Sequence, residues 1–203
     1  MTRLALIRHG ETVWNAERRF TTHSDAELSD AGVAQATAAA EALAAETIDR
    51  IYTSPLQRAA RTAAIIAEAQ HGGCPVMADD RLVEIDAGPF EGKTSEELEA
   101  GPLAAAFAAW HTDDAEPVFP DGAETFVDAL ARASAFLAEH EGETGTTLIV
   151  THGSLARLIV CSHFLGGPPP LHRRLWLDNC RLTVFEERQG VSKMVVFNAT
   201  RIG

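Results

Sequence analysis

The sequence predicts an α/β fold in which a mostly parallel central sheet lies between two layers of helices. Short apolar runs alternate with helix-forming segments over the first 70 residues, and this order is typical of a parallel sheet covered on both faces. Two of the apolar runs end in a histidine followed by glycine. The chain has 203 residues, a length that suits one domain with a substantial core, so we predict a single three-layer sandwich over residues 1–203.

The N-terminal elements follow from apolar runs and capping residues. Residues 4–7 are a continuous apolar run and predict a buried strand. Ser29 is a good N-cap for the alanine-rich helix that we expect to reach about residue 46. Residues 48–53 predict a second strand. Ser54-Pro55 then has the residue types of an N-cap and a first helical position, so we expect a helix from there to about residue 69.

The middle of the chain is less regular. Residues 81–92 contain two glycines and a proline and predict a turn-rich loop. Thr94 to Glu97 has capping-box spacing and predicts the start of a helix that runs to about Trp110. Residues 111–122 are acidic, contain two prolines and predict a second loop. We expect residues 88–124 to form a small cap of helices and loops over the carboxyl ends of the strands.

The C-terminal part predicts a helix over 123–140, a buried strand over 146–151 and a helix over 154–165. Two further strands, over 182–186 and 193–198, are expected to close the sheet.

Composition limits the classes of partner. The formal net charge of −12 disfavours nucleic acid and anionic membranes, so any attraction for a phosphate group must be local. The three cysteines, Cys74, Cys161 and Cys180, are odd in number and lack CxxC spacing. They indicate reduced thiols and a cytoplasmic location. The sequence leaves the oligomeric state open, with a homodimer among the alternatives.

Two histidines occupy equivalent places. His9 and His152 each end a predicted buried strand, and Gly10 and Gly153 follow them. Ligands of open α/β sheets bind beyond the carboxyl ends of the strands, so two such histidines on adjacent strands could face one phosphate group. The glycines would let the backbone approach that ligand closely. A metal site is a weaker alternative, because the sequence lacks HxH and HExxH spacing.

A phosphoryl-transfer site explains this pattern better. One histidine would be the nucleophile and the other a hydrogen-bond donor to the phosphate. Arg8 and Arg58 could clamp the phosphate oxygens, since a guanidinium group presents a planar fork of donors. Glu84 has apolar neighbours, and burial favours the neutral acid form of a carboxyl group, so Glu84 could protonate the leaving group.

The sequence resembles the histidine phosphatase superfamily, in its phosphoglycerate mutase-like branch. Five segments between residue 3 and about residue 160 resemble the motifs of that family in the same order: Arg8–Thr12 (RHGET), Leu28–Ala36, Ser54–Ala63, Leu82–Gly92 and Val150–Gly153. RHG alone is a weak signal, but five ordered segments in matching strand and helix contexts are specific.

The resemblance implies a role for each matching residue. His9 would accept the phosphoryl group and Glu84 would be the acid and base. The phosphate pocket would be formed by Arg8, Arg58 and His152, with further contacts from Asn15 and from a backbone amide near Thr21, Thr22 or Gly153. The resemblance implies no metal and no cofactor. Members of the family often have glycine where Thr22 stands, so Thr22 is expected to add a hydroxyl to the pocket or to narrow it.

Several other residues are expected to have structural roles. Four aromatic residues are expected to pack in the core: Phe90, Phe107, Trp110 and Phe119. As an alternative, they could line a lid that selects an apolar leaving group. Arg61 is expected at the surface, and His23 and His172 are expected to be inert.

The sequence therefore favours a metal-independent phosphomonoesterase that acts on a small phosphorylated metabolite through a phosphohistidine. A mutase of the phosphoglycerate type is the alternative. Mutases of this family typically have a longer insertion before the second histidine, whereas the stretch from Glu84 to His152 is compact here. A non-catalytic module that binds phosphate esters is a third hypothesis, disfavoured because both histidines, both arginines and the glutamate are present. Attack by neutral His9 and protonation by acidic Glu84 together predict a rate maximum on the acidic side of neutrality.

Overall fold

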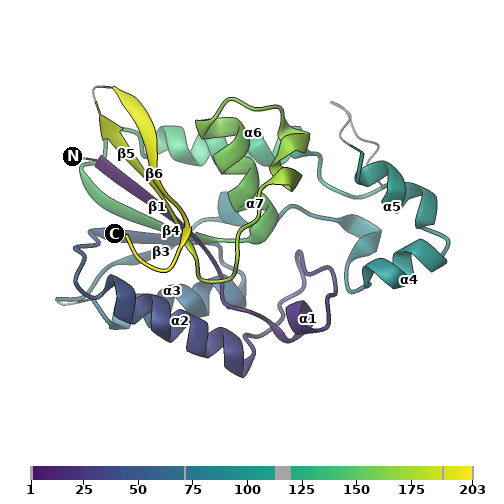
Figure 1. The fold of residues 1–203 in the computed structure, drawn as a ribbon, viewed down its shortest axis with the longest axis horizontal. Helices are drawn as coiled ribbons and strands as arrows, with labels where there is room; N and C mark the ends of the chain where they lie inside the picture. Colours follow the sequence, from purple (N-terminus) through teal and green to yellow (C-terminus); the bar gives the residue numbers. More distant parts are fainter. Residues whose placement is uncertain (1, 71, 113–119, 189, 203) are drawn as a thin grey trace.

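The computed structural model describes residues 2–70, 72–112, 120–188 and 190–202. Its centre is a six-stranded sheet with the order β3-β2-β4-β1-β5-β6 (Figure 1). The pairs formed among β1, β2, β3 and β4 are all parallel. Strand β5 is antiparallel to both of its neighbours, β1 and β6. Their bounds are β1 Thr2–Arg8, β2 Arg50–Thr53, β3 Val76–Ala78, β4 Gly145–Thr151, β5 Leu182–Arg188 and β6 Val191–Ala199. The prediction of a mostly parallel sheet is confirmed.

Helices cover both faces of this sheet, as predicted (Figure 1). On one face, α2 (Asp30–Leu43) and α3 (Gln57–Glu68) share a core cluster with alternate residues of the strands. On the other face, α6 (Phe126–Glu139) and α7 (Gly153–Leu158) share a second cluster. The central strands are therefore buried on both sides, which is why their sequences are continuously apolar.

The start of α2 is confirmed, but that of α3 is wrong by two residues. The Ser29 hydroxyl accepts a hydrogen bond from Gly32 N at 3.0 Å, as an N-cap should. Ser54 instead extends β2, because its N–H donates to Val150 O on the neighbouring strand. Helix α3 begins at Gln57, whose N–H donates to Asp25 Oδ1 at 2.6 Å. The cap of α3 thus comes from a segment distant in the sequence.

The middle of the chain corrects a second prediction. The capping box at Thr94 is confirmed and opens α4 (Ser95–Ala100). The helix does not continue to Trp110, because it ends at Gly101-Pro102 and a separate helix, α5 (Ala104–Trp110), follows. Proline lacks the N–H that would continue the helix, and a side chain at Gly101 would lie 2.7 Å from Glu97 O. Phe119 lies outside the described residues.

Smaller elements complete the fold. The sequence analysis missed the short strand β3 and the one-turn helix α1 (Val13–Ala16), while turns over Asp80–Leu82 and Gly88–Phe90 confirm the turn-rich loop. Helix α7 passes into a π-helical turn, Ile159–Phe164, and a 3-10 helix spans Pro169–Arg174. All three cysteines are free. Within the described ranges, none of the helices has the length and hydropathy required to traverse a bilayer.

Candidate active site

The two histidines meet at the carboxyl ends of adjacent parallel strands, as predicted. Arg8 of β1 pairs with Thr151 of β4, so the next residue of each strand is a histidine. The N–H of His9 donates to Thr151 O at 2.9 Å. The imidazole rings of His9 and His152 are 5.1 Å apart between centroids at an interplanar angle of 62°. Both side chains are buried, with 3% and 0% of their surface exposed.

The hydrogen bonds of His9 assign a role to each ring nitrogen. Its Nδ1 is 2.6 Å from Gly10 O, and a carbonyl oxygen can only accept, so Nδ1 carries the proton. The Nε2 atom therefore keeps its lone pair, and Arg58 Nε donates to it at 3.3 Å. Burial lowers the pKa of His9 well below its ordinary value, and the positive charges of Arg58 and Arg8 lower it further. His9 is thus a neutral imidazole, and its unprotonated Nε2, which accepts only the hydrogen bond from Arg58, can attack an electrophile.

The Arg58 guanidinium is fully buried in the first turn of α3. Its Nη1 donates to Ser24 O at 2.9 Å and its Nη2 to Thr22 O at 2.6 Å. Each terminal nitrogen retains a second N–H, because a guanidinium group has five donors in all. Burial lowers the pKa of Arg58, but arginine remains charged in proteins. The side chain therefore places a fixed positive charge against His9 Nε2.

Arg8 and His152 supply uncommitted polar atoms. Among the residues that the structure describes, no protein group hydrogen-bonds to Arg8 Nε or to either ring nitrogen of His152, although all three atoms are buried. Buried polar atoms in proteins nearly always have partners, so these atoms are suited to a ligand. Arg8 is anchored at its other end, where Nη1 donates to Leu177 O at 2.9 Å. Burial, followed by the charge of Arg58, lowers the pKa of His152 well below its ordinary value.

The two glycines allow close contacts within the protein. A Cβ on Gly10 would lie 2.5 Å from Gly32 O, at the start of α2. A Cβ on Gly153 would lie 3.2 Å from Arg8 Nε. Gly10 thus lets the His9 loop pack on α2, and Gly153 leaves room for the Arg8 guanidinium.

The surroundings of Glu84 are more polar than its apolar neighbours suggested. Its side chain is 7% exposed, and Oε1 accepts hydrogen bonds from Ile85 N and Leu155 N, both at 2.9 Å. Its Oε2 accepts from Ser154 N, also at 2.9 Å. Two of these donors belong to the first turn of α7, directly after His152. Such donors stabilise a carboxylate, so the predicted preference for the acid form does not follow from this geometry.

A cavity of about 410 Å³ opens beside these groups. The predicted site residues that line it are Arg8, Asn15, Thr21, Thr22, Glu84 and Gly153. His9, Arg58 and His152 do not line it in this structure, although Arg8 and Gly153, which do, are the chain neighbours of His9 and His152. The Asn15 side chain is partly committed, because its Oδ1 accepts from Thr12 N in the capping box of α1.

Thr22 lines the cavity, and its donor groups are committed to a carboxylate. Both its N–H and its hydroxyl donate to Glu91 Oε2, the former at 2.8 Å. Its hydroxyl is therefore not free for a phosphate group in this structure. The Thr21 hydroxyl donates to Arg19 O at 3.2 Å.

His172, which the sequence analysis expected to be inert, lies at the cavity. It lies in the 3-10 helix Pro169–Arg174, lines the cavity, and is almost fully buried. Its Nδ1 donates to Pro169 O at 2.8 Å, and its ring contacts Phe126 at 4.7 Å between centroids. Burial lowers the pKa of His172 to about 3. Trp110 combines both roles considered for the aromatic residues, because it is part of the core and also lines the cavity. Arg61 is exposed as expected.

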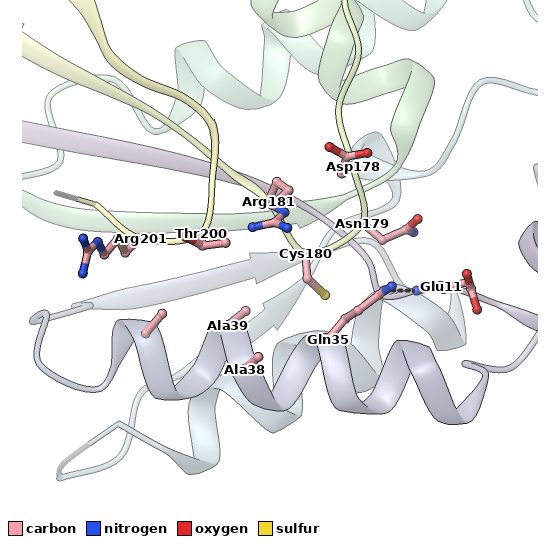
Figure 2. A pocket seen from close by; sticks show the side chains of 11 residues that line it. Glu11, Gln35, Ala38, Ala39, Asp178, Asn179, Cys180, Arg181, Thr200 and Arg201 are labelled. Atoms are coloured by element: carbon pink, nitrogen blue, oxygen red, sulfur yellow. Dashed lines mark hydrogen bonds between the residues drawn. The ribbon is translucent and has the colours of Figure 1, made fainter.

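A second cavity, of about 620 Å³, is lined by residues of α2, by Glu11 and by the segment before β5 (Figure 2). Figure 2 shows Gln35 on α2 reaching the loop, where Glu11 N donates to its Oε1 at 2.9 Å. From the other wall, Asn179 Nδ2 donates to His9 O at 2.8 Å, and Cys180 N donates to Arg8 O at 2.9 Å. The backbone that carries the nucleophile is therefore held from α2 and from the segment before β5.

Thr62 is a further residue that sequence reasoning missed. Gly10 N donates to its hydroxyl at 3.1 Å, and that hydroxyl donates to Arg58 O at 2.8 Å. It ties the His9 loop to α3. Within the described part of the chain, no group of three or more His, Cys, Asp or Glu side chains is placed to hold a metal ion.

The protein thus has an α/β fold with a buried pair of histidines and two arginines near the carboxyl ends of its central strands. A sequence model described as "Histidine phosphatase superfamily (branch 1)" matches residues 4–200. The chain is 37% identical over 195 residues to "Probable phosphoglycerate mutase GpmB" of Klebsiella pneumoniae subsp. pneumoniae, covering 93% of this chain and 86% of that protein. It is 34% identical to phosphoserine phosphatase 1 of Hydrogenobacter thermophilus, covering 94% and 90%.

A solved structure agrees with this assignment. The α-ribazole phosphatase of Shigella flexneri superimposes with a TM-score of 0.87 at 26% identity and covers 99% of this chain and 98% of its own. The chain belongs to branch 1 of the histidine phosphatase superfamily, which confirms the family resemblance. Its relatives include named phosphatases and named phosphoglycerate mutases.

Proposed function

We propose that this protein hydrolyses a small phosphate monoester and that His9 Nε2 is the atom that becomes phosphorylated. The observation that carries the proposal is the state of that atom. Its lone pair is unprotonated because Nδ1 holds the proton, it accepts a hydrogen bond from Arg58 Nε at 3.3 Å, and the His152 ring lies beside it. Family membership, with relatives named as phosphatases, supports the same chemistry.

The proposed reaction has two displacements at phosphorus. In the first, the Nε2 lone pair forms the N–P bond while the P–O bond to the leaving alcohol breaks, and the alcohol oxygen takes a proton. In the second, water attacks the phosphohistidine, loses a proton and releases inorganic phosphate and neutral His9. The charges of Arg8 and Arg58 and the ring N–H of His152 would stabilise the negative charge on the phosphoryl oxygens in both steps.

Glu84 is proposed as the group that gives and later takes the proton. It lines the cavity that Arg8 also lines, so an ester with its phosphoryl group at Arg8 would place its leaving oxygen within the same space. Its carboxylate accepts three backbone hydrogen bonds, and this fixes its orientation. The second step needs the carboxylate as base.

The substrate is proposed to be a small phosphate ester in the cytoplasm. The cavity volume of about 410 Å³ is in the range of small-molecule sites. We further propose that residues 88–124 form the cap that contacts the leaving group, since Trp110 and His111 of this segment line the cavity. Asn15, Thr21 and the backbone of Gly153 are proposed as further contacts to the ester, because each lines the same space.

Intramolecular transfer is the second candidate, because a relative named as a phosphoglycerate mutase matches 93% of the chain. The phosphohistidine would then return its phosphoryl group to another oxygen of the same molecule. Incubation with 3-phosphoglycerate separates the two reactions, since hydrolysis releases inorganic phosphate and transfer yields 2-phosphoglycerate.

Turnover of a panel of phosphate esters tests the proposal. Wild-type protein should release phosphate from at least one ester, and His9→Ala should abolish this release. Arg61→Ala is the matched control for an arginine change, because Arg61 is exposed on α3 and should leave turnover unchanged, whereas Arg58→Ala should lower it at least a hundredfold. Tight binding of esters without any hydrolysis would instead support a non-catalytic module.

A further inference from the structure

The segment Thr22–Ser24 is held between two opposite charges. On one side, the Glu91 carboxylate accepts from Thr22 N at 2.8 Å, from the Thr22 hydroxyl, and from Ser24 N at 2.9 Å. On the other side, the carbonyl oxygens of the same two residues accept from Arg58 at 2.6 and 2.9 Å. The N–H groups of this segment thus point to the anion and its carbonyl groups to the cation.

Glu91 is itself firmly placed. It follows the turn Gly88–Phe90, and the two residues after it pair with Phe20 in the segment before Thr22. Gly92 N donates to Phe20 O at 2.9 Å, and Phe20 N donates to Lys93 O at 2.9 Å. These backbone bonds fix the base of the Glu91 side chain, so its carboxylate can define the position of Thr22 and Ser24.

The carboxylate of Glu91 is ionised throughout the neutral range. Burial alone would raise the pKa of Glu91, but the hydrogen bonds from Thr22 and Ser24 outweigh burial and lower it below the ordinary value. Its negative charge also favours the charged form of Arg58, together with that of Glu84. Glu91 does not line the cavity beside Arg8, so it acts at a distance from any ester bound there.

We propose that Glu91 is a positioning residue, which orients the Arg58 guanidinium against His9 Nε2 through the carbonyl groups of Thr22 and Ser24. Thr22 has a defined part in this arrangement, because its hydroxyl gives the carboxylate a third donor that glycine could not supply. The expected effect on kcat/KM rests on the proposed function, but the expected movement of Arg58 can be measured without turnover.

Glu91→Gln is the direct test. The amide keeps the shape of the side chain but loses the charge. Its NH2 group replaces one carboxylate oxygen and cannot accept a hydrogen bond, so either Thr22 or Ser24 loses its acceptor. We expect kcat/KM for a phosphate ester to fall between tenfold and a hundredfold, as displacement of a phosphate-binding group by about 1 Å does. Glu97→Gln is the matched control, since Glu97 also accepts from a backbone N–H and an arginine, yet contacts neither Arg58 nor Thr22.

A double-mutant cycle separates positioning from a general loss of stability. In an Arg58→Lys background, Glu91→Gln should change kcat/KM less than twofold, because the group through which it acts has been replaced. An undiminished effect of Glu91→Gln in that background would overturn the proposal, as would an effect no larger than that of Glu97→Gln.

Crystal structures of the variants decide the question even if no ester is turned over. In Glu91→Gln the Arg58 guanidinium should leave its place at 3.3 Å from His9 Nε2, whereas in Glu97→Gln it should remain. An unmoved Arg58 in Glu91→Gln would contradict the inference and leave the proposed function intact. Failure of the wild-type protein to hydrolyse or transfer would count against the proposed function alone.

Discussion

At the scale of single residues, the site depends on which state each buried side chain can hold. His9 is neutral with a defined tautomer, Arg58 is charged, and Glu84 is an oriented carboxylate. The same burial that excludes water from these groups raises the free energy of a protonated imidazole. A nucleophile of this kind should keep its lone pair in mildly acidic solution.

This property predicts the pH dependence of catalysis. Because burial and two arginines lower the pKa of His9 well below 6.5, protonation of His9 should not reduce kcat/KM between pH 7 and 5.5. An imidazole of ordinary pKa would lose about tenfold in kcat/KM over that range. Initial rates from pH 5 to 8, corrected for ionisation of the ester, check this. A tenfold fall by pH 5.5 would show that His9 titrates normally and would contradict the assignment.

At the scale of elements, α3 shows how a distant residue can place a catalytic group. Its N-terminus is capped by Asp25, which lies 32 residues away, and not by Ser54. Arg58 is the second residue of the helix, so the cap also fixes the turn that carries the guanidinium. The sequence could not reveal this cap, because the pairing depends on where the segment before α2 crosses the start of α3.

Loss of this cap should destabilise the protein measurably. Asp25→Ala removes the acceptor of Gln57 N and should lower the free energy of unfolding by about 1 kcal/mol, the usual effect of losing an N-cap. Urea denaturation measures the change. Glu27→Ala is a suitable control, since Glu27 is exposed on the same segment and should alter stability by less than about 0.5 kcal/mol. Equal effects of the two substitutions would show that Asp25 does not cap α3.

Other elements show what a local pattern can and cannot predict. The strands β1 and β4 were predictable because burial on both faces leaves a continuous apolar run, and their motifs placed His9 and His152. The break between α4 and α5 could have been predicted, since Gly101-Pro102 is a turn signal. The three residues of β3 are too few for any period. The contacts of Gly10 with Gly32 and of Thr22 with Glu91 are long-range, and only the folded chain brings them together.

At the scale of the whole molecule, an acidic protein concentrates positive charge near the carboxyl ends of its central strands. The net charge is −12, yet Arg8 and Arg58 stand beside two neutral histidines. A third buried histidine, His172, lies at the cavity. All three have a lowered pKa in the folded state, and the pKa of His172 is lowered to about 3.

These histidines should make folding stability depend on pH. Below about pH 6.5 the unfolded chain binds protons at these sites and the folded chain does not, so stability is lost as the pH falls. Because the pKa of His172 is lowered to about 3, this histidine alone should reduce the free energy of unfolding at pH 5 by about 2 kcal/mol relative to pH 7. In His172→Asn, the difference in stability between pH 7 and pH 5, measured by denaturation, should shrink by about that amount.

A packing control identifies the source of this effect. Phe126→Leu disturbs the ring contact of His172 but removes no titrating group, so the pH dependence of stability should persist at a lower overall stability. If His172→Asn kept the full pH dependence, His172 would have to titrate normally in the folded protein.

The identity of the phosphorylated atom tests the central claim most directly. Wild-type protein can be quenched rapidly during turnover of an ester with a labelled phosphoryl group, and the label mapped by peptide mass spectrometry and by 31P NMR of the phosphoimidazole. The account predicts an acid-labile label on His9 at Nε2, absent from His9→Ala, because Nδ1 is committed to Gly10 O. A label on another residue, a label at Nδ1, or turnover that survives in His9→Ala would contradict it.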